Sequence, residues 1–443
     1  MNLLLLKKLK AEIPFNMSQT NLYKTSSSLE KCILVAVALS SQKKWITEEN
    51  LQELEELAST AGAIVVDKII QERNKYDPAF FIGKGKAEQL ALQISEFEVD
   101  LLIFDDELSP AQIRNLEQIT DIKVIDRSAL ILDIFAAHAK SREARTQVEL
   151  AQLNYLLPRL TRQWTHLSRQ VGGIGTKGPG ETQLETDRRL LRTRISYLNQ
   201  ELKNIEKQRL IQRKQQQEFI RAALVGYTNA GKSTLMNALT HSSVLIEDKL
   251  FATLDTTIRK LNIDGGIPVL LSDTVGFIRK LPHHLVASFR STLAQTVEAD
   301  ILLHVIDISN PMYEEHILTV DRILKDLNIS DKPLVMVFNK VDKIDSESLI
   351  AKNQLKYPNS VFVSAKKNIR IEKIKKTMYT TLKVRFKEKN IKLSYQQSHY
   401  LQKIGEIAHI ASTKYGEQNI TVQVRIEKEN ELKFNNLIKK ISP

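Results

Sequence analysis

Between Lys31 and His138 the chain alternates short apolar runs with longer stretches whose apolar residues recur every three or four positions. The short runs predict strands, and the longer stretches predict amphipathic helices. We expect strands at Cys32–Leu39, Ala63–Ile70, Leu101–Phe104 and Lys123–Ile125, and helices at Glu48–Ala61, Gly85–Phe97 and Ser109–Ile119. Such alternation is typical of an α/β domain with a largely parallel sheet, which we predict for residues 31–140. The mostly polar residues 1–30 predict a disordered extension.

A different pattern follows at residues 141–218, where two long amphipathic segments flank a glycine-rich stretch, Gly172–Gly180. The second segment has apolar residues at alternating spacings of four and three, a heptad seam that needs a partner helix. The seam consists of Leu191, Ile195, Leu198, Leu202 and Ile205. On the first segment, the residues expected to pack against this seam are Val148, Ala151, Tyr155 and Leu156. Because the glycine-rich stretch cannot continue a helix, we predict an α-helical hairpin, that is, an antiparallel coiled coil with a glycine-rich tip.

The α/β pattern returns after Phe219 and continues to about Val384. The remaining residues, 385–443, are rich in lysine and predict a helix near Ser398–Thr413, followed by an alternating strand at Ile420–Ile426. We therefore predict an α/β multidomain protein in which residues 219–384 form one domain and residues 385–443 form a small α+β domain.

Composition narrows the class of protein. Hydrophobic residues make up 42% of the chain and charged residues 26%, which is typical of a globular protein. Because Cys32 is the single cysteine, an intramolecular disulfide is excluded. The sequence contains no run of about 18 apolar residues, so we predict no membrane span. We expect a monomeric cytoplasmic protein without integral membrane association, and we leave peripheral membrane association open.

Positive charge is concentrated in the predicted hairpin. Residues 159–221 hold fourteen Lys and Arg against six Asp and Glu, so this segment has a net charge of +8 out of +12 for the whole chain. Such a run can be an ordinary solvated helix face. Beside a glycine-rich loop whose backbone N–H groups and Lys177 suit phosphates, it instead favours a nucleic-acid surface.

A phosphate-binding motif, G-x-x-x-x-G-K-[ST], is present at Gly226–Ser233. It follows the apolar run Ala222–Val225 and precedes a predicted helix, which is the order of strand, loop and helix that the motif needs. In such a loop, backbone amides surround the phosphates, Lys232 reaches the β- and γ-phosphates, and the Ser233 hydroxyl binds Mg²⁺.

Three further sequences follow predicted strands. Asp273-Thr274-Val275-Gly276 offers a carboxylate for Mg²⁺ and a glycine N–H for the γ-phosphate. In Asn339-Lys340-Val341-Asp342, the Asp342 carboxylate can accept hydrogen bonds from N1–H and N2–H₂ of guanine, a donor pair that adenine lacks. Ser364-Ala365-Lys366 offers backbone N–H groups for the guanine O6. In this order they resemble the G1, G3, G4 and G5 motifs of translation-factor-type GTPases, so we predict a GTP/GDP site with Mg²⁺ and a P-loop GTPase domain.

The fifth element, the switch sequence, is Phe251-Ala252-Thr253-Leu254-Asp255-Thr256-Thr257, which offers three threonines. We expect one of them to close on Mg²⁺ and the γ-phosphate when GTP is bound. We also expect catalytic roles for Lys232 and Gly276, and a Mg²⁺ contact from Ser233, with Asp273 in the surrounding shell. The predicted GTP-binding residues are Gly226, Tyr227, Thr228, Asn229, Ala230, Gly231, Lys232, Ser233, Phe251, Ala252, Thr253, Leu254, Asp255, Asp273, Thr274, Val275, Gly276, Asn339, Lys340, Val341, Asp342, Ser364, Ala365 and Lys366.

Two residues differ from a Ras-like site. Phe277 stands where Ras-like proteins have the glutamine that orients the attacking water, so we expect slow intrinsic hydrolysis. Asn229 resembles the asparagine of potassium-stimulated GTPases, which raises the hypothesis of a K⁺ site.

The chain as a whole resembles the HflX family of bacterial ribosome-associated GTPases, of the translation-factor-related Obg–HflX type. The resemblance extends over about Lys31–Val384 and is carried by Phe81–Lys86, Gln147–Leu153, Gly172–Gly175, Gly178–Arg189 and Asp273–Ile278. Phe81–Lys86 holds two glycine–lysine pairs; we favour a tight turn before a helix there, with a second phosphate site as the alternative.

The resemblance implies a GTPase that binds the 50S subunit and its 23S rRNA, not DNA, and helps separate stalled or stress-arrested 70S ribosomes. It also implies that Thr253 is the switch threonine, which contacts Mg²⁺ and takes part in catalysis, although Thr256 stands where the family usually has proline. Two alternatives stay open: a ribosome-assembly GTPase acting on 50S precursors, and a GTP-gated binding module with little turnover.

Overall fold

The computed structural model describes residues 30–41, 43–160, 179–214, 219–240, 250–251, 256–263, 267–280, 294–344, 347–383, 386–427 and 430–441. Residues 1–29 of the predicted extension and residues 172–178 of the predicted glycine-rich tip therefore lie outside the described residues, whereas Pro179 and Gly180, also predicted for the tip, begin a helix. The chain divides into two compact units, of which the first is residues 1–202 with 280–288 and the second is residues 203–279 with 289–443.

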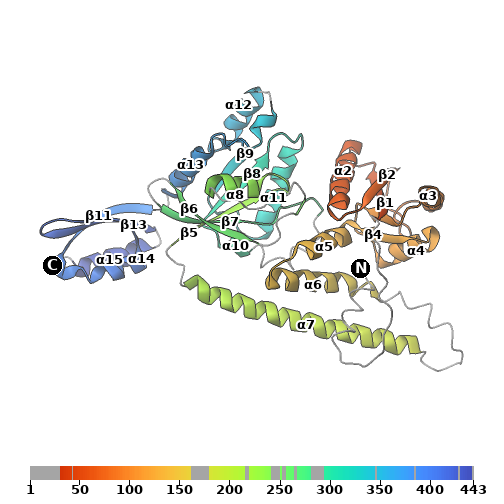
Figure 1. Ribbon diagram of the computed structural model, residues 1–443, viewed down its shortest axis with the longest axis horizontal. Helices are drawn as coiled ribbons and strands as arrows, with labels where there is room; N and C mark the ends of the chain where they lie inside the picture. Colours follow the sequence, from red (N-terminus) through yellow and green to blue (C-terminus); the bar gives the residue numbers. More distant parts are fainter. Residues whose placement is uncertain are drawn as a thin grey trace. The chain divides into compact units, whose positions relative to one another are not determined.

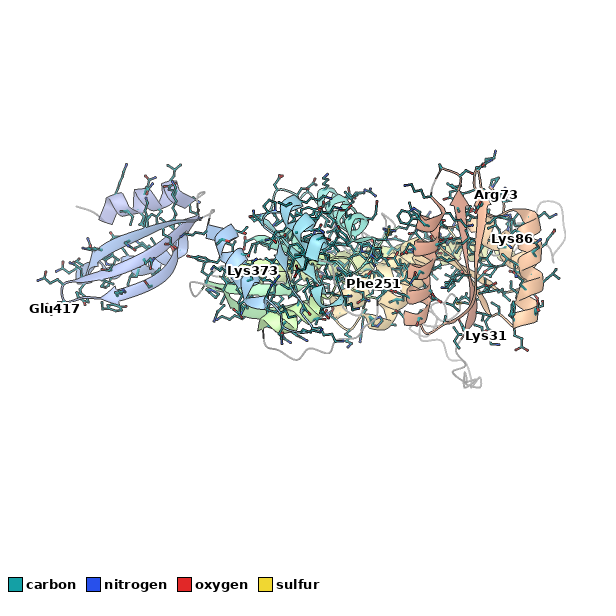
Figure 2. The ribbon with its side chains drawn as sticks, turned by 90° about the horizontal axis from the view of Figure 1, so that it is seen from above. Lys31, Arg73, Lys86, Phe251, Lys373 and Glu417 are labelled. Atoms are coloured by element: carbon teal, nitrogen blue, oxygen red, sulfur yellow. The ribbon has the colours of Figure 1, made fainter. Side chains whose placement is uncertain are left out.

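The first unit is built on a four-stranded parallel sheet of order β2-β1-β3-β4. Its strands are β1 (Lys31–Leu39), β2 (Ile64–Arg73), β3 (Leu101–Phe104) and β4 (Lys123–Asp126). Its helices are α2 (Lys44–Thr60), α3 (Lys84–Phe97), α4 (Pro110–Thr120) and α5 (Arg127–His138). Figure 2 shows Lys31 and Arg73 at opposite ends of this sheet, where β1 begins and β2 ends. The glycine–lysine turn leads into a helix as predicted, because Gly83 is the N-cap of α3.

Two further helices, α6 (Arg142–Leu156) and α7 (Pro179–Lys214), run alongside each other (Figure 1). The predicted seam is present, since Leu191 and Leu198 of α7 pack with Leu150 and Leu153 of α6. The predicted upstream face was wrong. Tyr155 turns away from the seam and donates a hydrogen bond from its hydroxyl to Asp126 Oδ1 over 2.9 Å, because α6 also packs against α5 and must bury both sides.

The second unit holds a six-stranded sheet of order β10-β9-β8-β5-β7-β6, in which only β6 is antiparallel to its neighbour. The strands are β5 (Ile220–Gly226), β6 (Thr257–Ile263), β7 (Ile267–Asp273), β8 (Ile301–Asp307), β9 (Leu334–Asn339) and β10 (Val361–Phe362). Its helices are α8 (Lys232–Thr240), α10 (Ala294–Glu298), α11 (Tyr313–Asp326), α12 (Glu347–Lys356) and α13 (Ile371–Lys383), and a short 3₁₀ turn, η3, covers Val341–Lys343. Helices α8 and α13 share an apolar core on one face of the sheet, while α11 packs on the other.

The C-terminal part is an antiparallel sheet of order β11-β13-β12 with helices packed on its apolar face. Its elements are β11 (Phe386–Ser394), η4 (Tyr395–Gln397), α14 (Tyr400–Ile407), β12 (His409–Tyr415), β13 (Asn419–Glu427) and α15 (Glu431–Ile441). The predicted helix at Ser398–Thr413 was too long, because its last residues leave α14 and pair with β13 as a strand. The predicted fold class, an α/β multidomain protein with a mainly parallel GTPase-type sheet and a small α+β part, is confirmed.

Candidate functional site

The glycine loop connects the end of β5 to the start of α8, and glycine is required at both of its motif positions. Gly226 has φ +154°, and a Cβ there would lie 2.2 Å from the Val305 carbonyl oxygen. Gly231 has φ +90°, and a Cβ there would lie 2.4 Å from Asn339 Nδ2. Any side chain at these positions would strain the backbone and push the loop off its neighbours.

Lys232 lies inside the loop and is 7% exposed. Its Nζ donates to the carbonyls of Gly226 (3.2 Å) and Tyr227 (2.9 Å). Burial lowers the pKa of Lys232 to about 8, and the nearby charge of Asp273 opposes that shift. The loop thus holds its lysine in one buried place, and an anionic ligand there would favour the charged form of Lys232.

The ends of α8 and β7 meet at Ser233 and Asp273. The Ser233 hydroxyl donates to Asp273 Oδ2 over 2.5 Å, and Asp273 is 2% exposed. A hydroxyl and a carboxylate are the hard oxygen donors that Mg²⁺ prefers, and Mg²⁺ bound with phosphates needs few protein ligands. The donor set therefore fits this ion, although the described residues contain no group of three His, Cys, Asp or Glu arranged to hold a metal by themselves.

The segment after β7 packs directly on the glycine loop. A Cβ at Gly276 would lie 2.8 Å from Thr228 Cα and 2.9 Å from Lys232 Nζ. Phe277 N donates to the Gly226 carbonyl over 3.0 Å, and Thr228 N donates to the Phe277 carbonyl over 2.7 Å. Phe277 is 2% exposed and packs in the core under α11. Its ring therefore serves packing and presents no polar group to a water molecule.

Asn339, at the end of β9, links three loops. Its Nδ2 donates to the Ala230 carbonyl over 2.9 Å, and its Oδ1 accepts from Ala365 N over 3.0 Å. These bonds hold the sequences after β9 and β10 against the glycine loop. A hydrogen bond with Ser364 lowers the pKa of Asp342, which keeps this carboxylate ionised and able to accept hydrogen bonds.

Sequence reasoning missed Asp307. Its Oδ2 lies 2.7 Å from Lys340 Nζ, and its Oδ1 accepts from Ser309 N and Oγ. Lys340 has φ +64°, so this ion pair holds a residue in the left-handed region within the Asn-Lys-Val-Asp sequence. The sequence feature that could have identified Asp307 is its place as an acidic residue at the end of a buried strand, Ile301–Asp307.

The structure thus brings together the glycine loop, Asp273–Gly276, Asn339 and Ala365, and it leaves Lys366 exposed. Phe251 is 3% exposed. The predicted switch residues Ala252, Thr253, Leu254 and Asp255 lie outside the described residues, as does most of the glycine-rich stretch from Gly172 to Gly178.

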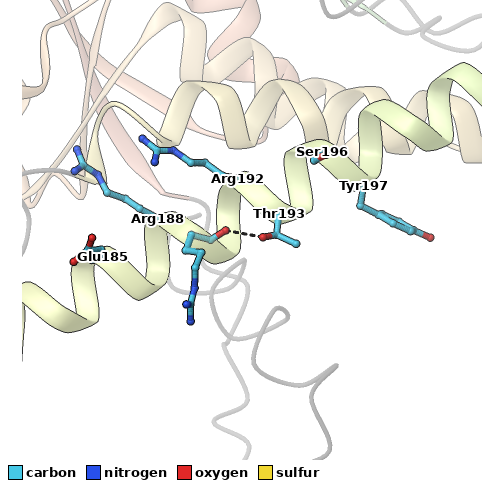
Figure 3. Close-up of a pocket in the computed structure, with 7 residues that line it drawn as sticks. Glu185, Arg188, Arg192, Thr193, Ser196 and Tyr197 are labelled. Atoms are coloured by element: carbon cyan, nitrogen blue, oxygen red, sulfur yellow. Dashed lines mark hydrogen bonds between the residues drawn. The ribbon is translucent and has the colours of Figure 1, made fainter.

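A second candidate surface lies on α7. Glu185, Arg188, Arg189, Arg192, Thr193, Ser196 and Tyr197 line a shallow hollow on this helix (Figure 3). Arg188 and Arg192, one helical turn apart, extend in the same direction in Figure 3. Arg194 instead pairs with Glu149 of α6 over 2.7 Å, so it supports the helix pair. Helix α7 therefore has arginine side chains that reach its surface, besides the face that packs on α6.

A glycine loop between β5 and α8, an aspartate at the end of β7 and an Asn-Lys-Val-Asp sequence after β9 define a P-loop GTPase. Comparison with known proteins gives the family. Three family models match, described as GTP-binding GTPase N-terminal (residues 48–136), GTP-binding GTPase Middle Region (138–216) and 50S ribosome-binding GTPase (221–340). The chain belongs to the HflX family of GTPases.

Two relatives illustrate the likeness. The chain is 48% identical to the GTPase HflX of Flavobacterium psychrophilum, over 82% of this chain and 92% of that protein. It is 41% identical to the GTPase HflX of Escherichia coli, over 90% of this chain and 93% of that protein. A crystal structure of a GTP-binding protein from the archaeon Sulfolobus solfataricus in complex with GDP is 25% identical, with a TM-score of 0.43 over 80% of this chain and 98% of that one.

Among the described residues, no helix is both long enough and apolar enough to cross a bilayer.

Proposed function

We propose that this GTPase binds the large ribosomal subunit and, in its GTP-bound state, helps dissociate stalled or stress-arrested 70S ribosomes. Ribosome binding would stimulate its hydrolysis of GTP to GDP and phosphate. The observation that carries the proposal is the presence, in one chain of this family, of a glycine loop joined to Asp273 and Asn339 and of a basic helix surface at Arg188 and Arg192.

Each group at the nucleotide site has a proposed role. Lys232 faces the β- and γ-phosphates, Gly276 N–H contacts the γ-phosphate, and Asn339 and Asp342 position and read guanine. The support is the convergence of these groups: Lys232 lies beside Gly276, and Asn339 joins the glycine loop to Ala365. Thr253 is proposed as a switch residue from the sequence alone.

We assign Mg²⁺ to Ser233 and Thr253, with Asp273 holding its water ligands; when bound, the ion neutralises charge on the phosphates. The support is the 2.5 Å contact between Ser233 and Asp273. A K⁺ ion beside Asn229 is a separate proposal. Asn229 has φ +57° and is exposed at the loop surface, where it can reach a cation beside phosphate. Equal hydrolysis rates in KCl and NaCl would exclude it.

The proposed ribosomal contact is 23S rRNA, through the basic face of α7. Phosphate contacts dominate protein–RNA affinity, and guanidinium groups suit phosphate geometry. Arg192 is exposed and Arg188 is half-buried, so both side chains reach the surface.

The test combines sedimentation with turnover. Purified 70S ribosomes are incubated with the chain and a non-hydrolysable GTP analogue and then separated on a sucrose gradient. Conversion of 70S to 50S and 30S particles, together with ribosome-stimulated GTP turnover, is the expected result. Binding to 50S precursors without splitting would instead support a role in ribosome assembly.

A GTP-gated binding module with little turnover is the second candidate function. It is favoured by Phe277, which is buried and offers no group to orient water. Turnover that stays unchanged on adding 50S subunits or 70S ribosomes, with tight GTP binding retained, would favour this candidate over the first.

A further inference from the structure

Tyr227 is held in place by an aromatic stack. It occupies the second position of the glycine loop, which the motif leaves free to be any residue. Its ring lies on the His316 ring of α11, with centroids 3.8 Å apart and an interplanar angle of 6°. Tyr227 is 7% exposed, so the ring is fixed both by the stack and by the surrounding core. Phosphate binding by the loop does not by itself require a buried aromatic side chain at this position, so Tyr227 has another role.

The polar end of Tyr227 reaches the segment after β7. Its hydroxyl accepts a hydrogen bond from Arg279 N over 2.9 Å. On either side of Tyr227 in the chain, Gly226 and Thr228 bond the backbone of Phe277 over 3.0 and 2.7 Å. Gly226, Tyr227 and Thr228 are consecutive loop residues, and each bonds to Phe277 or Arg279. Of these three hydrogen bonds, the one at Tyr227 involves a side chain, and the other two join backbone groups.

These bonds determine where Gly276 lies, because it directly precedes Phe277. A Cβ at Gly276 would meet Lys232 Nζ at 2.9 Å, so the two groups proposed to converge on the γ-phosphate are already neighbours. Pre-arranged groups bind a ligand without the cost of ordering them on binding. GDP lacks a γ-phosphate, so the part of this gain that comes from Gly276 applies to GTP alone.

We propose that Tyr227 is a positioning residue that sets the preference for GTP over GDP. His316 holds the ring, and the hydroxyl holds Arg279 so that Gly276 N–H stays in place for the γ-phosphate. This inference rests on the proposed nucleotide role of Gly276.

The test measures the affinity of the full chain for GDP and for a non-hydrolysable GTP analogue by isothermal titration calorimetry. Tyr227→Phe removes the hydroxyl and keeps the stack. It is expected to weaken binding of the GTP analogue about two- to tenfold, the range for one neutral hydrogen bond, and to leave GDP affinity unchanged. Tyr357→Phe, a tyrosine that packs against Phe338 away from the loop, is the matched control and should change neither affinity.

His316 gives an independent variant. His316→Ala releases the ring and should lower the ratio of GTP-analogue to GDP affinity, whereas His316→Phe can still stack and should restore that ratio. A merely structural role of the stack would lower both affinities together.

The results distinguish a failure of this inference from a failure of the proposed function. If Tyr227→Phe weakens GDP and the GTP analogue equally, or weakens neither, while the wild type binds both, the inference is overturned and the proposed function stands. A wild-type chain that binds neither nucleotide would overturn the proposed function, and this inference with it.

Discussion

At the scale of single residues, the requirement for glycine at Gly231 can be tested by adding one methyl group. Gly231→Ala adds a Cβ at φ +90°, 2.4 Å from Asn339 Nδ2. The left-handed backbone alone costs about 1–3 kcal/mol. Displacing Asn339 also breaks its bonds to Ala230 and Ala365, so we expect a lower free energy of unfolding and at least tenfold weaker GDP binding, measured by denaturant unfolding and calorimetric titration.

Gly85→Ala is the matched control for that substitution. Gly85 lies inside α3, and a Cβ there meets nothing within 4 Å. Gly85 is the second residue of α3, and replacing glycine by alanine where the backbone suits alanine stabilises by about 0.4–1 kcal/mol, so this variant should be neutral or slightly more stable. Equal loss of stability in both variants would contradict the close approach of Gly231 to Asn339.

A second residue-scale prediction concerns pH. His304 on β8 is 1% exposed, and its burial, reinforced by the charge of Lys232, lowers its pKa to about 3. The folded chain therefore keeps His304 neutral where the unfolded chain protonates it, near pH 6.5. Its contribution to stability is complete above about pH 6.5 and is lost as pH falls toward 3, at up to about 1.4 kcal/mol per pH unit.

His304→Leu should therefore flatten the dependence of the unfolding free energy on pH between 7 and 4, measured by urea unfolding at several pH values. His399→Gln, at an exposed histidine, should leave the profile of the wild type unchanged. A His304→Leu profile as steep as that of the wild type would rule out a neutral buried His304.

What the sequence predicts at this scale depends on how far apart the interacting residues lie. The glycine loop could be predicted because its residues are consecutive and must fit phosphate. The stack of Tyr227 on His316 and the pair of Lys340 with Asp307 could not, because each depends on how α11 or β8 lies beside a distant loop. The specific groups around the site are thus the part that needs the structure.

At the scale of elements, apolar runs predicted the buried strands well, since a strand covered on both faces needs apolar residues throughout. The expected strand at Leu101–Phe104 agrees with β3, and that at Cys32–Leu39 differs from β1 by one residue. The helix predicted at Ser398–Thr413 is present as α14 but was too long, because His409–Tyr415 gains a strand partner, β13. Pairing with a distant strand overrides local spacing, and one sequence does not reveal that pairing.

The α6–α7 pair gives the prediction at this scale. Leu198 is 1% exposed and packs in the seam with Leu150 and Leu153. Leu198→Ala should cost about 2–5 kcal/mol through lost burial and the cavity left behind. Because the chain has two units, native-state hydrogen exchange is the suitable measurement, and amide protection in α6 and α7 should fall.

Leu190→Ala controls for the change of residue type on the same helix. Leu190 is 50% exposed, so its truncation should cost less than about 0.5 kcal/mol and leave the protection of α6 unchanged. If both variants exchange alike, the seam does not hold the two helices together.

At the scale of the whole molecule, the distribution of charge matters more than its sum. A net charge of +12 spread evenly would favour only solubility and non-specific attraction to polyanions. Residues 159–221 carry a net charge of +8, from fourteen basic and six acidic residues, so the attraction is concentrated in one segment. Binding to rRNA should therefore depend on which charges are removed, and not only on how many.

The paired variant Arg188→Gln/Arg192→Gln removes two charges from the basic surface of α7. Loss of two phosphate contacts should weaken 50S binding and make it less dependent on salt, with a slope of log K against log salt smaller by about 1–2.

Lys373→Gln/Lys376→Gln is the matched control. It removes the same charge from the exposed face of α13 and should change neither the affinity for 50S subunits nor the salt dependence. Co-sedimentation with 50S subunits at several KCl concentrations measures both, and GTP turnover without ribosomes should stay at the wild-type rate in each pair. Equal weakening by the two pairs would mean that net charge, rather than the α7 surface, directs the chain to the ribosome.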